Sequence, residues 1–226
     1  MIAAATAEEA AELREGLRAL DIALAEDRIA ALLRYLDLLY VWNRMAGLTT
    51  IPRKDGVRLH LLDSLAVLRA IDRGPCLDLG TGAGLPGMVL AIADPESRLV
   101  LVESNRRRCS FLLEVVRLLA LGNVRVVESD VESLDRGVRY PLVLSRAFRP
   151  PVEFASIASG LVAPGGRIVL MLADPDASEV EEIRRASGMS MAKAHRFGLP
   201  GGREKRTVLV LEDGEAGSGM FHGKQP

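Results

Sequence analysis

Apolar residues in the first 70 positions recur at helical spacing. Between residues 7 and 45 leucines and other apolar residues return every three or four positions, with charged residues between them. A second stretch with a leucine face covers residues 55–71, and the Thr-Thr-Ile-Pro sequence at 49–52 separates the two. The pattern predicts an all-helical N-terminal extension of residues 1–72.

From residue 73 onward, short apolar runs alternate with helical stretches. The runs predict strands at residues 76–79, 99–102, 124–127, 142–144 and 168–172. The stretches between them predict helices near residues 86–93, 107–121 and 152–161. Two further runs, at 189–197 and 207–211, predict a terminal hairpin on the sheet edge. This alternation predicts an α/β domain over residues 73–213 with a doubly wound, mostly parallel sheet, followed by a Gly-rich, disordered tail at 214–226.

The composition limits the kinds of partner that the protein is expected to bind. The 226 residues are 49% apolar, and 29 basic residues against 30 acidic ones give a formal net charge of -1. A polyanion must therefore be held by a local basic patch. Arg makes up 25 of the 29 basic residues, and its planar fork suits phosphates and guanine edges, although an organism rich in Arg and Ala would show the same bias.

The sequence gives no sign of a disulfide, a metal site or a membrane segment. Cys76 and Cys109 lie 33 positions apart, and the three His residues add no zinc-ligand spacing. No stretch reaches 18 uncharged apolar residues, and the N-terminus lacks the regions of a signal peptide. We expect a cytoplasmic, monomeric protein without a metal and without membrane association.

The glycine-rich sequence at 77–87 is the strongest local signal. It follows a predicted strand and opens a helix, so Gly80, Gly82 and Gly84 allow a sharp turn close to a ligand, and the helix N-terminus would offer free N–H groups to an anion. Gly82, Gly84 and Gly87 also match the G-x-G-x-x-G spacing of dinucleotide enzymes. A nucleotide-like ligand is expected at this loop.

Two features favour S-adenosylmethionine, with S-adenosylhomocysteine as product, over NAD. Asp78 would repel a pyrophosphate but can bind the ammonium group of a methionine, directly or through water. The pair Gly80 and Gly82 also begins the loop earlier than a dinucleotide fingerprint requires. Glu103 ends the second strand, where a carboxylate can accept both ribose hydroxyls of either ligand, unless it is a solvated strand-end acid.

Segments after the third and fourth strands would complete the pocket. Asp130, Val131 and Glu132 would meet the adenine edge, or else form a surface turn. Because ligands bind beyond the carboxyl ends of the strands, Arg146 and Arg149 are expected where the methyl group is delivered. Arg146 has the alternative role of a structural partner for an Asp or Glu.

The same region restricts the methyl acceptor. Arg149 and Val152 stand where amino-group methylation would require an Asn or Asp and an aromatic residue around a Pro-Pro pair. Neither cysteine occupies the place of a nucleophile, which disfavours carbon methylation through a covalent adduct. Acceptors that are already nucleophilic remain, such as guanine N7, whose methylation needs alignment and no general base.

Basic residues near these segments are candidates for RNA contacts. The run from Arg106 to Arg108 begins a helix, where cations oppose the helix dipole; a phosphate partner would explain this, and a solvated charged face is the alternative. Further candidates to position RNA are Arg149, Arg203, Lys205 and Arg206. With only nine aromatic residues, RNA shape and phosphate contacts would outweigh base stacking.

Taken together, the motifs resemble the bacterial small-subunit ribosomal RNA guanine-N7 methyltransferases, also called the glucose-inhibited division protein B family. The similarity covers roughly residues 30–211, and its parts occur in the family's order. They are Trp42-Asn43 with Leu48-Thr49, the His60 to Leu65 sequence, the loop from Asp78 to Gly87, Glu103-Ser104 with Arg107-Arg108, and Ser145-Arg146-Ala147.

The resemblance implies a Rossmann-like class I methyltransferase with a helical cap on a seven-stranded sheet, acting on N7 of a guanine in small-subunit (16S) ribosomal RNA or the small ribosomal subunit. It places Gly80, Leu85, Val131, Glu132 and Arg146 at cofactor-contacting positions, with Arg146 as the catalytic candidate and Glu103 as the ribose acid. It places Asn43, His60, Asp63 and Ser64 at the junction of the helical extension and the pocket, toward the substrate.

Five positions depart from the family pattern. Ala46, Gly47, Pro141, Leu172 and Thr207 stand where the family has an aromatic residue, Asn, an acid, Lys and His. The changes at Leu172 and Thr207 remove polar groups from strand ends on the substrate side. Two alternatives therefore accompany the main hypothesis: a methyltransferase for a small molecule or protein, and a non-catalytic cofactor-binding, ribosome-associated relative.

Overall fold

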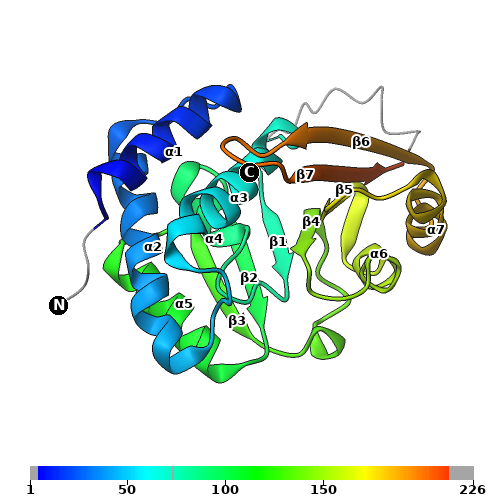
Figure 1. The fold of residues 1–226 in the computed structure, drawn as a ribbon. Helices are drawn as coiled ribbons and strands as arrows, with labels where there is room; N and C mark the ends of the chain where they lie inside the picture. The colour runs from blue at the N-terminus through cyan, green and yellow to red at the C-terminus, as the bar shows by residue number, and fades with distance from the viewer. Residues whose placement is uncertain (1–4, 73, 214–226) are drawn as a thin grey trace.

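The computed structural model describes residues 5–72 and 74–213 (Figure 1). The first predicted helical stretch is two helices, α1 (Ala7–Ala19) and α2 (Glu26–Ala46), rather than one. The chain reverses between them through Asp21, whose φ is 56°. The reversal buries Leu13 and Leu17 of α1, which a single continuous helix would have left in solvent.

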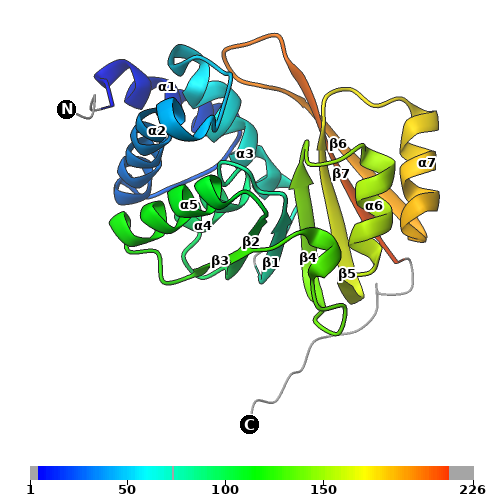
Figure 2. The same cartoon turned by 90° about the horizontal axis from the view of Figure 1, so that it is seen from below.

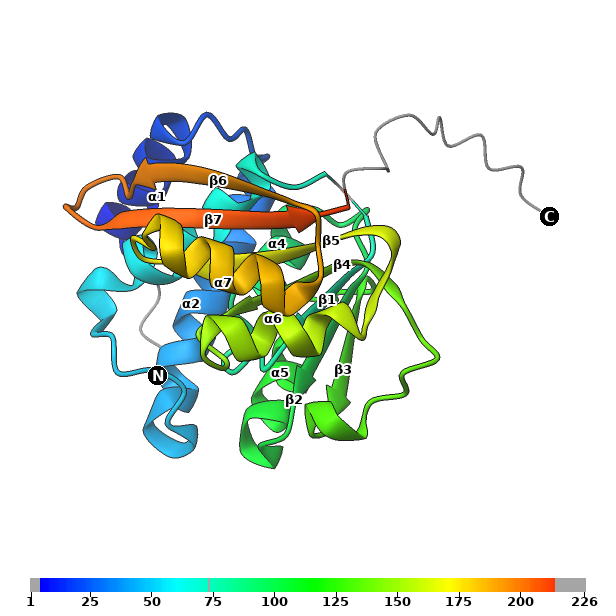
Figure 3. The same ribbon diagram turned by 90° about the vertical axis from the view of Figure 1, so that its right-hand side faces the viewer.

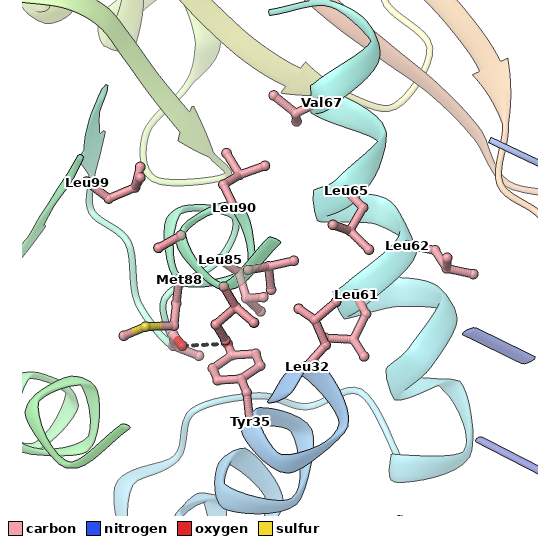
Figure 4. Close-up of a cluster of buried hydrophobic side chains, with 14 of the residues drawn as sticks. Leu32, Tyr35, Leu61, Leu62, Leu65, Val67, Leu85, Met88, Leu90 and Leu99 are labelled. Carbon is pink, nitrogen blue, oxygen red and sulfur yellow. Dashed lines mark hydrogen bonds between the residues drawn. The ribbon is translucent and has the colours of Figure 1, made fainter. Parts of the chain in front are cut away.

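The second helical stretch is irregular but continuous. It consists of four short pieces: η1 (Arg53–Asp55), η2 (Val57–Leu62), α3 (Asp63–Leu65) and η3 (Ala66–Arg69). Leu61, Leu62 and Leu65 from these pieces pack into the same apolar cluster as Leu32 of α2 (Figure 4). Gly16 of α1 lies directly against Leu62, where a larger residue would not fit.

Seven strands form one sheet, in the order β3-β2-β1-β4-β5-β7-β6, with β7 antiparallel to its neighbours β5 and β6. The strands are β1 (Cys76–Leu79), β2 (Leu99–Glu103), β3 (Val124–Glu128), β4 (Tyr140–Arg146), β5 (Val162–Leu172), β6 (Met191–Gly198) and β7 (Lys205–Glu212). The predicted mostly parallel sheet and its terminal hairpin are confirmed. The fourth and fifth strands begin earlier than the apolar runs indicated.

Helices cover both faces of the sheet (Figures 2 and 3). The N-terminal helices, α4 (Gly87–Ala93) and α5 (Arg106–Leu118) contribute to one apolar cluster, whereas α6 (Pro151–Ser159) and α7 (Ala177–Ser187) contribute to the other. Helix α7 was not predicted. Asp176 caps its first turn and Gly188, with φ 70°, ends it, so both termination signals were present in the sequence.

The helical extension and the sheet share a continuous core. Tyr35 of α2 is fully buried, and its hydroxyl donates to the carbonyl of Ala83 in the glycine-rich loop at 2.7 Å (Figure 4). The extension therefore supports the loop directly, and the domain boundary near residue 73 remains a prediction. The proposed tail at 214–226 lies outside the described residues. Within residues 5–72 and 74–213, no helix combines the length and apolar character needed to cross a membrane.

Candidate functional site

The loop between β1 and α4 uses its glycines in two different ways. Gly80 and Gly82 have φ values of 63° and 60°, and a side-chain carbon at Gly82 would meet only the Gly80 carbonyl oxygen, at an ordinary contact distance of 3.9 Å. A side chain at Gly84 or Gly87 would instead collide with the protein itself, against Met88 at 2.7 Å and against Asp78, respectively. The last two glycines of the dinucleotide-like spacing therefore serve internal packing, and the open approach to a ligand is at Gly82.

Asp78 at the end of β1 is fully buried, with one carboxylate oxygen free. Its Oδ2 accepts from the Thr81 hydroxyl at 2.6 Å and from the N–H of Gly87 at 2.8 Å, while Oδ1 has no hydrogen-bond partner among the described residues. Burial raises the pKa of Asp78 to about 7, against the lowering effect of these hydrogen bonds and of Arg146. Because Asp78 accepts the N–H of Gly87, this first N–H of α4 is not available to a ligand anion.

Glu103 at the end of β2 is held in a fixed orientation. Its Oε2 accepts from the N–H of Gly82 at 2.9 Å and its Oε1 from the N–H of Asn105 at 2.8 Å. The Arg108 guanidinium lies 3.8 Å away. The side chain is buried rather than solvated, so its remaining lone pairs can accept hydrogen bonds from a ligand at a defined position.

Two adjoining cavities follow the carboxyl ends of β1, β2 and β4. A cavity of about 290 Å³ is lined by Gly80, Glu103, Phe148 and the segment Asp130, Val131 and Glu132. One of about 420 Å³ is lined by the 47–51 segment with His60, Gly82, Leu85 and Arg146. Both contain Gly80, Arg108 and Ala147, so together they form one crevice across the glycine-rich loop. The structure thus brings together most of the cofactor residues named from the sequence, while Gly84 lies behind the loop.

Arg146 faces this crevice and is also part of an ion network. Its Nη1 lies 3.2 Å from Oδ2 of Asp63 and donates to the carbonyl of Leu59 at 3.0 Å. Oδ1 of Asp63 accepts from Nε of Arg206 at 3.0 Å. The two sequence-based interpretations of Arg146, pocket residue and structural ion pair, are therefore both met by its geometry.

The other junction residues mainly hold the wall of the crevice. The side-chain amide of Asn43 binds both the carbonyl and the N–H of Thr49. His60 Nε2 lies 3.0 Å from the Thr49 hydroxyl, and burial, aided by Arg146, lowers the pKa of His60 to about 4, so the ring is neutral. Ser64 is fully buried, and its hydroxyl has no hydrogen-bond partner within the part of the chain that the structure describes. Of these residues only His60 lines the crevice, and their substrate contacts remain predictions.

Arg149 is less available than the sequence suggested, and its neighbour Phe148 was missed. Arg149 pairs with Glu132 at 2.9 Å and with Glu153 at 2.6 Å, and its guanidinium lies 5.2 Å from the centre of the Phe148 ring. The Phe148 ring packs so closely on Gly80 that a side chain at Gly80 would overlap it. An aromatic residue directly after Ser-Arg-Ala at the end of a central strand was the available signal.

Neither cysteine is placed to act as a nucleophile. Cys76 lies at the amino end of β1, away from the crevice, and burial raises its pKa. Cys109 donates its thiol to the carbonyl of Glu103, and burial raises its pKa to about 11. The geometry agrees with the expectation that no covalent adduct forms.

This sheet order, with an antiparallel β7 and a glycine-rich loop between two strand-end acids, defines a Rossmann-like class I methyltransferase. A solved methyltransferase from Pyrococcus furiosus shares the fold with a TM-score of 0.53 and 16% identity over 84% of this chain and 100% of that one. The chain belongs to the rRNA small subunit methyltransferase G (GidB) family, whose sequence model matches residues 28–208. The family resemblance inferred from the motifs is thereby confirmed.

Curated relatives match nearly the whole chain. The ribosomal RNA small subunit methyltransferase G of Xanthomonas euvesicatoria is 38% identical over 216 residues, which are 94% of this chain and 99% of the relative. That of Stenotrophomonas maltophilia is 40% identical over 205 residues, 89% of this chain and 94% of the relative. Family membership makes the protein a methyltransferase and excludes the NAD-dehydrogenase alternative.

Proposed function

We propose that the protein transfers the methyl group of S-adenosylmethionine to N7 of a guanine in small-subunit ribosomal RNA, in the cytoplasm. The observation that carries this proposal is the crevice across the glycine-rich loop, with the fixed carboxylate of Glu103 in its wall. Glu103 can accept the ribose hydroxyls beside Asp130, Val131 and Glu132. Asp78 is buried behind the loop, and its Oδ1, which has no partner among the described residues, can reach the ammonium group of the methionine through water. The open approach at Gly82 and the apolar contact at Leu85 fit the middle of such a ligand.

The chain's contribution to the reaction is alignment. When bound, S-adenosylmethionine would supply a sulfonium-linked methyl group to the N7 lone pair of guanine, with S-adenosylhomocysteine as the leaving group. No proton has to be removed, so the neutral His60 and the ion-paired Arg146 need not act as bases. Arg146 is suited to hold the geometry of the crevice at the place of transfer, because it ties β4 to Asp63 of the helical extension.

Two measurements test the proposal. Calorimetry with S-adenosylhomocysteine and NAD is expected to show binding of the former alone, with binding lost in Glu103→Gln. Small subunits from a strain deleted for the gene are expected to lack one 7-methylguanosine, detected by reduction and aniline cleavage of the RNA. The wild-type gene should restore this mark, and Glu103→Gln should not. An unchanged modification pattern in the deletion strain would overturn the RNA substrate, and would favour a small molecule or protein acceptor.

A further inference from the structure

A third cavity, of about 410 Å³, lies beside the cofactor crevice at the carboxyl ends of β4 and β5. Ala147, Phe148 and Arg149 line both this cavity and the crevice next to it. The Phe148 ring, packed on Gly80 and bounded by the Arg149 guanidinium, is therefore the wall common to the two spaces. The volume of the third cavity is in the range of small-ligand sites and exceeds the volume of a purine base.

The lining of this cavity combines apolar walls with two acids. Phe154, Leu170 and Leu172 provide apolar surface, and the segment that follows β5 contributes the carboxylates of Asp174 and Glu179. Glu179 is half-buried, and no hydrogen bond or ion pair of its side chain is found among the described residues. Within residues 5–72 and 74–213, the one ion pair of Asp174 is a distant contact, 3.9 Å, with the exposed Lys205.

The cavity is unsuited to a phosphate. Among the described residues, Arg149 is the single basic side chain that lines it, and Glu132 and Glu153 already pair with that guanidinium. A ligand with a flat apolar body and hydrogen-bond donors along one edge fits this combination of walls and acids. Enzymes that modify a base take it out of the stack and bind it in such a pocket by its Watson–Crick edge.

We propose that this cavity receives the target guanine, with Glu179 and Asp174 accepting from its N1–H and 2-amino groups and Phe148 holding the base beside the cofactor. The inference rests on the proposed function and adds which side chains would select guanine over other bases. In the sheet order β1-β4-β5, β4 separates the glycine-rich loop that follows β1 from the segment after β5 that carries the two acids. N7 is on the opposite edge of the purine from N1 and the 2-amino group, so binding by the acids turns N7 toward the crevice.

Adenine is disfavoured in this arrangement, because its N1 is an acceptor and it has no 2-amino group. The binding test compares GMP with AMP on the protein saturated with S-adenosylhomocysteine. We expect GMP to bind about tenfold or more tightly than AMP. Glu179→Gln should reduce this preference to below about threefold, and Phe148→Ala should weaken GMP binding about tenfold or more, within the range of base–aromatic contacts. Equal binding of GMP and AMP, or no binding of either, would overturn the proposal.

Controls separate this pocket from the cofactor site and from α7 in general. Affinity for S-adenosylhomocysteine should stay within about threefold of wild type in Glu179→Gln, because Glu179 does not line the cofactor crevice. Glu182→Gln, at an exposed position on the same helix as Glu179, should leave the GMP preference unchanged. Phe148→Tyr should retain most GMP binding, because the ring is kept.

Methyl transfer to unmethylated small subunits gives the second readout. Glu179→Gln and Phe148→Ala should lower kcat/KM about tenfold or more, with Glu182→Gln within about twofold of wild type. If the wild-type protein methylates the RNA and both variants match it, the guanine pocket is wrong and the proposed function stands. If the wild type methylates no RNA but selects GMP over AMP, the proposed function is wrong and the pocket stands.

Discussion

Leu172 and Thr207 face each other across the antiparallel β5–β7 pair, so two departures from the family pattern are neighbours in space. Thr207 is buried, and its hydroxyl donates to the carbonyl of Ala173 at 3.5 Å. Leu172 lines the cavity beside the cofactor crevice. The two positions at which the sequence analysis expected a Lys and a His therefore lie together, and Leu172 contributes apolar surface to this cavity while Thr207 is not among its lining residues.

Restoring the family residues tests whether the two positions are coupled. Thr207→His alone would overpack a buried site and should lower the free energy of unfolding by about 1–3 kcal/mol. Leu172→Lys with Thr207→His should cost less than the sum of the single changes, because the cross-strand neighbour is altered with it. Urea unfolding of the four proteins measures this coupling. Strictly additive costs would show that the positions are independent.

The raised pKa of Asp78 predicts that the affinity for the cofactor depends on pH. With a pKa of about 7 in the unliganded protein, its carboxyl group is largely protonated at pH 6 and largely ionised at pH 8. The ammonium group of the ligand favours the carboxylate, so affinity for S-adenosylhomocysteine should rise over this range, with proton release on binding. Calorimetry in buffers of different ionisation enthalpy measures both effects. The same pH dependence in Asp78→Asn would assign it to another group.

The raised pKa of Asp78 also predicts that the free energy of unfolding depends on pH. The pKa of Asp78 is raised in the folded protein from a reference value of 3.8 to about 7, so protonation of this group favours the folded state. Its contribution to the free energy of unfolding is complete below about pH 4 and is lost as pH rises toward 7. Asp78→Asn, which cannot ionise, should lack this loss. Thermal unfolding of both unliganded proteins between pH 4 and 8 should therefore show curves that converge at low pH.

Gly80 and Gly82 should differ sharply in their tolerance of alanine. Both have positive φ, which costs about 1–2 kcal/mol for a residue with a side chain. At Gly82 the added carbon would meet only the Gly80 carbonyl oxygen at 3.9 Å, whereas at Gly80 it would overlap the Phe148 ring. Gly80→Ala should therefore lower stability more than Gly82→Ala in thermal unfolding. The extra cost should shrink in the Gly80→Ala/Phe148→Ala double variant, and its persistence would argue against this contact.

Asp63 should be more important for stability than the number of its ion pairs suggests. It is buried and accepts from both Arg146 and Arg206, so Asp63→Ala leaves two guanidinium groups without their partner and should cost about 2–3 kcal/mol. Glu114→Ala, which removes a surface partner of Arg117, should change the unfolding midpoint little. Equal effects of the two substitutions in urea unfolding would contradict the role assigned to the Asp63 network.

The parts of the fold that could be predicted depend on local patterns. The five parallel strands, the hairpin and the helices α4, α5 and α6 follow from the spacing of apolar residues. The break between α1 and α2 did not, because apolar residues continue at helical spacing through it and the reversal depends on packing against η2. Helix α7 was missed because its apolar face is short, although Asp176 and Gly188 mark its ends.

The sequence by itself determined the loop and its acids. A sharp turn requires glycine at Gly80 and Gly82, and carboxylates at the ends of two adjacent parallel strands necessarily reach the same edge of the sheet. Only the tertiary structure decided which residues meet across the chain: Arg146 with Asp63, Phe148 with Gly80, and Leu172 with Thr207. Such contacts join segments tens of residues apart, and they depend on how helices and strands pack against the sheet, which no local spacing specifies.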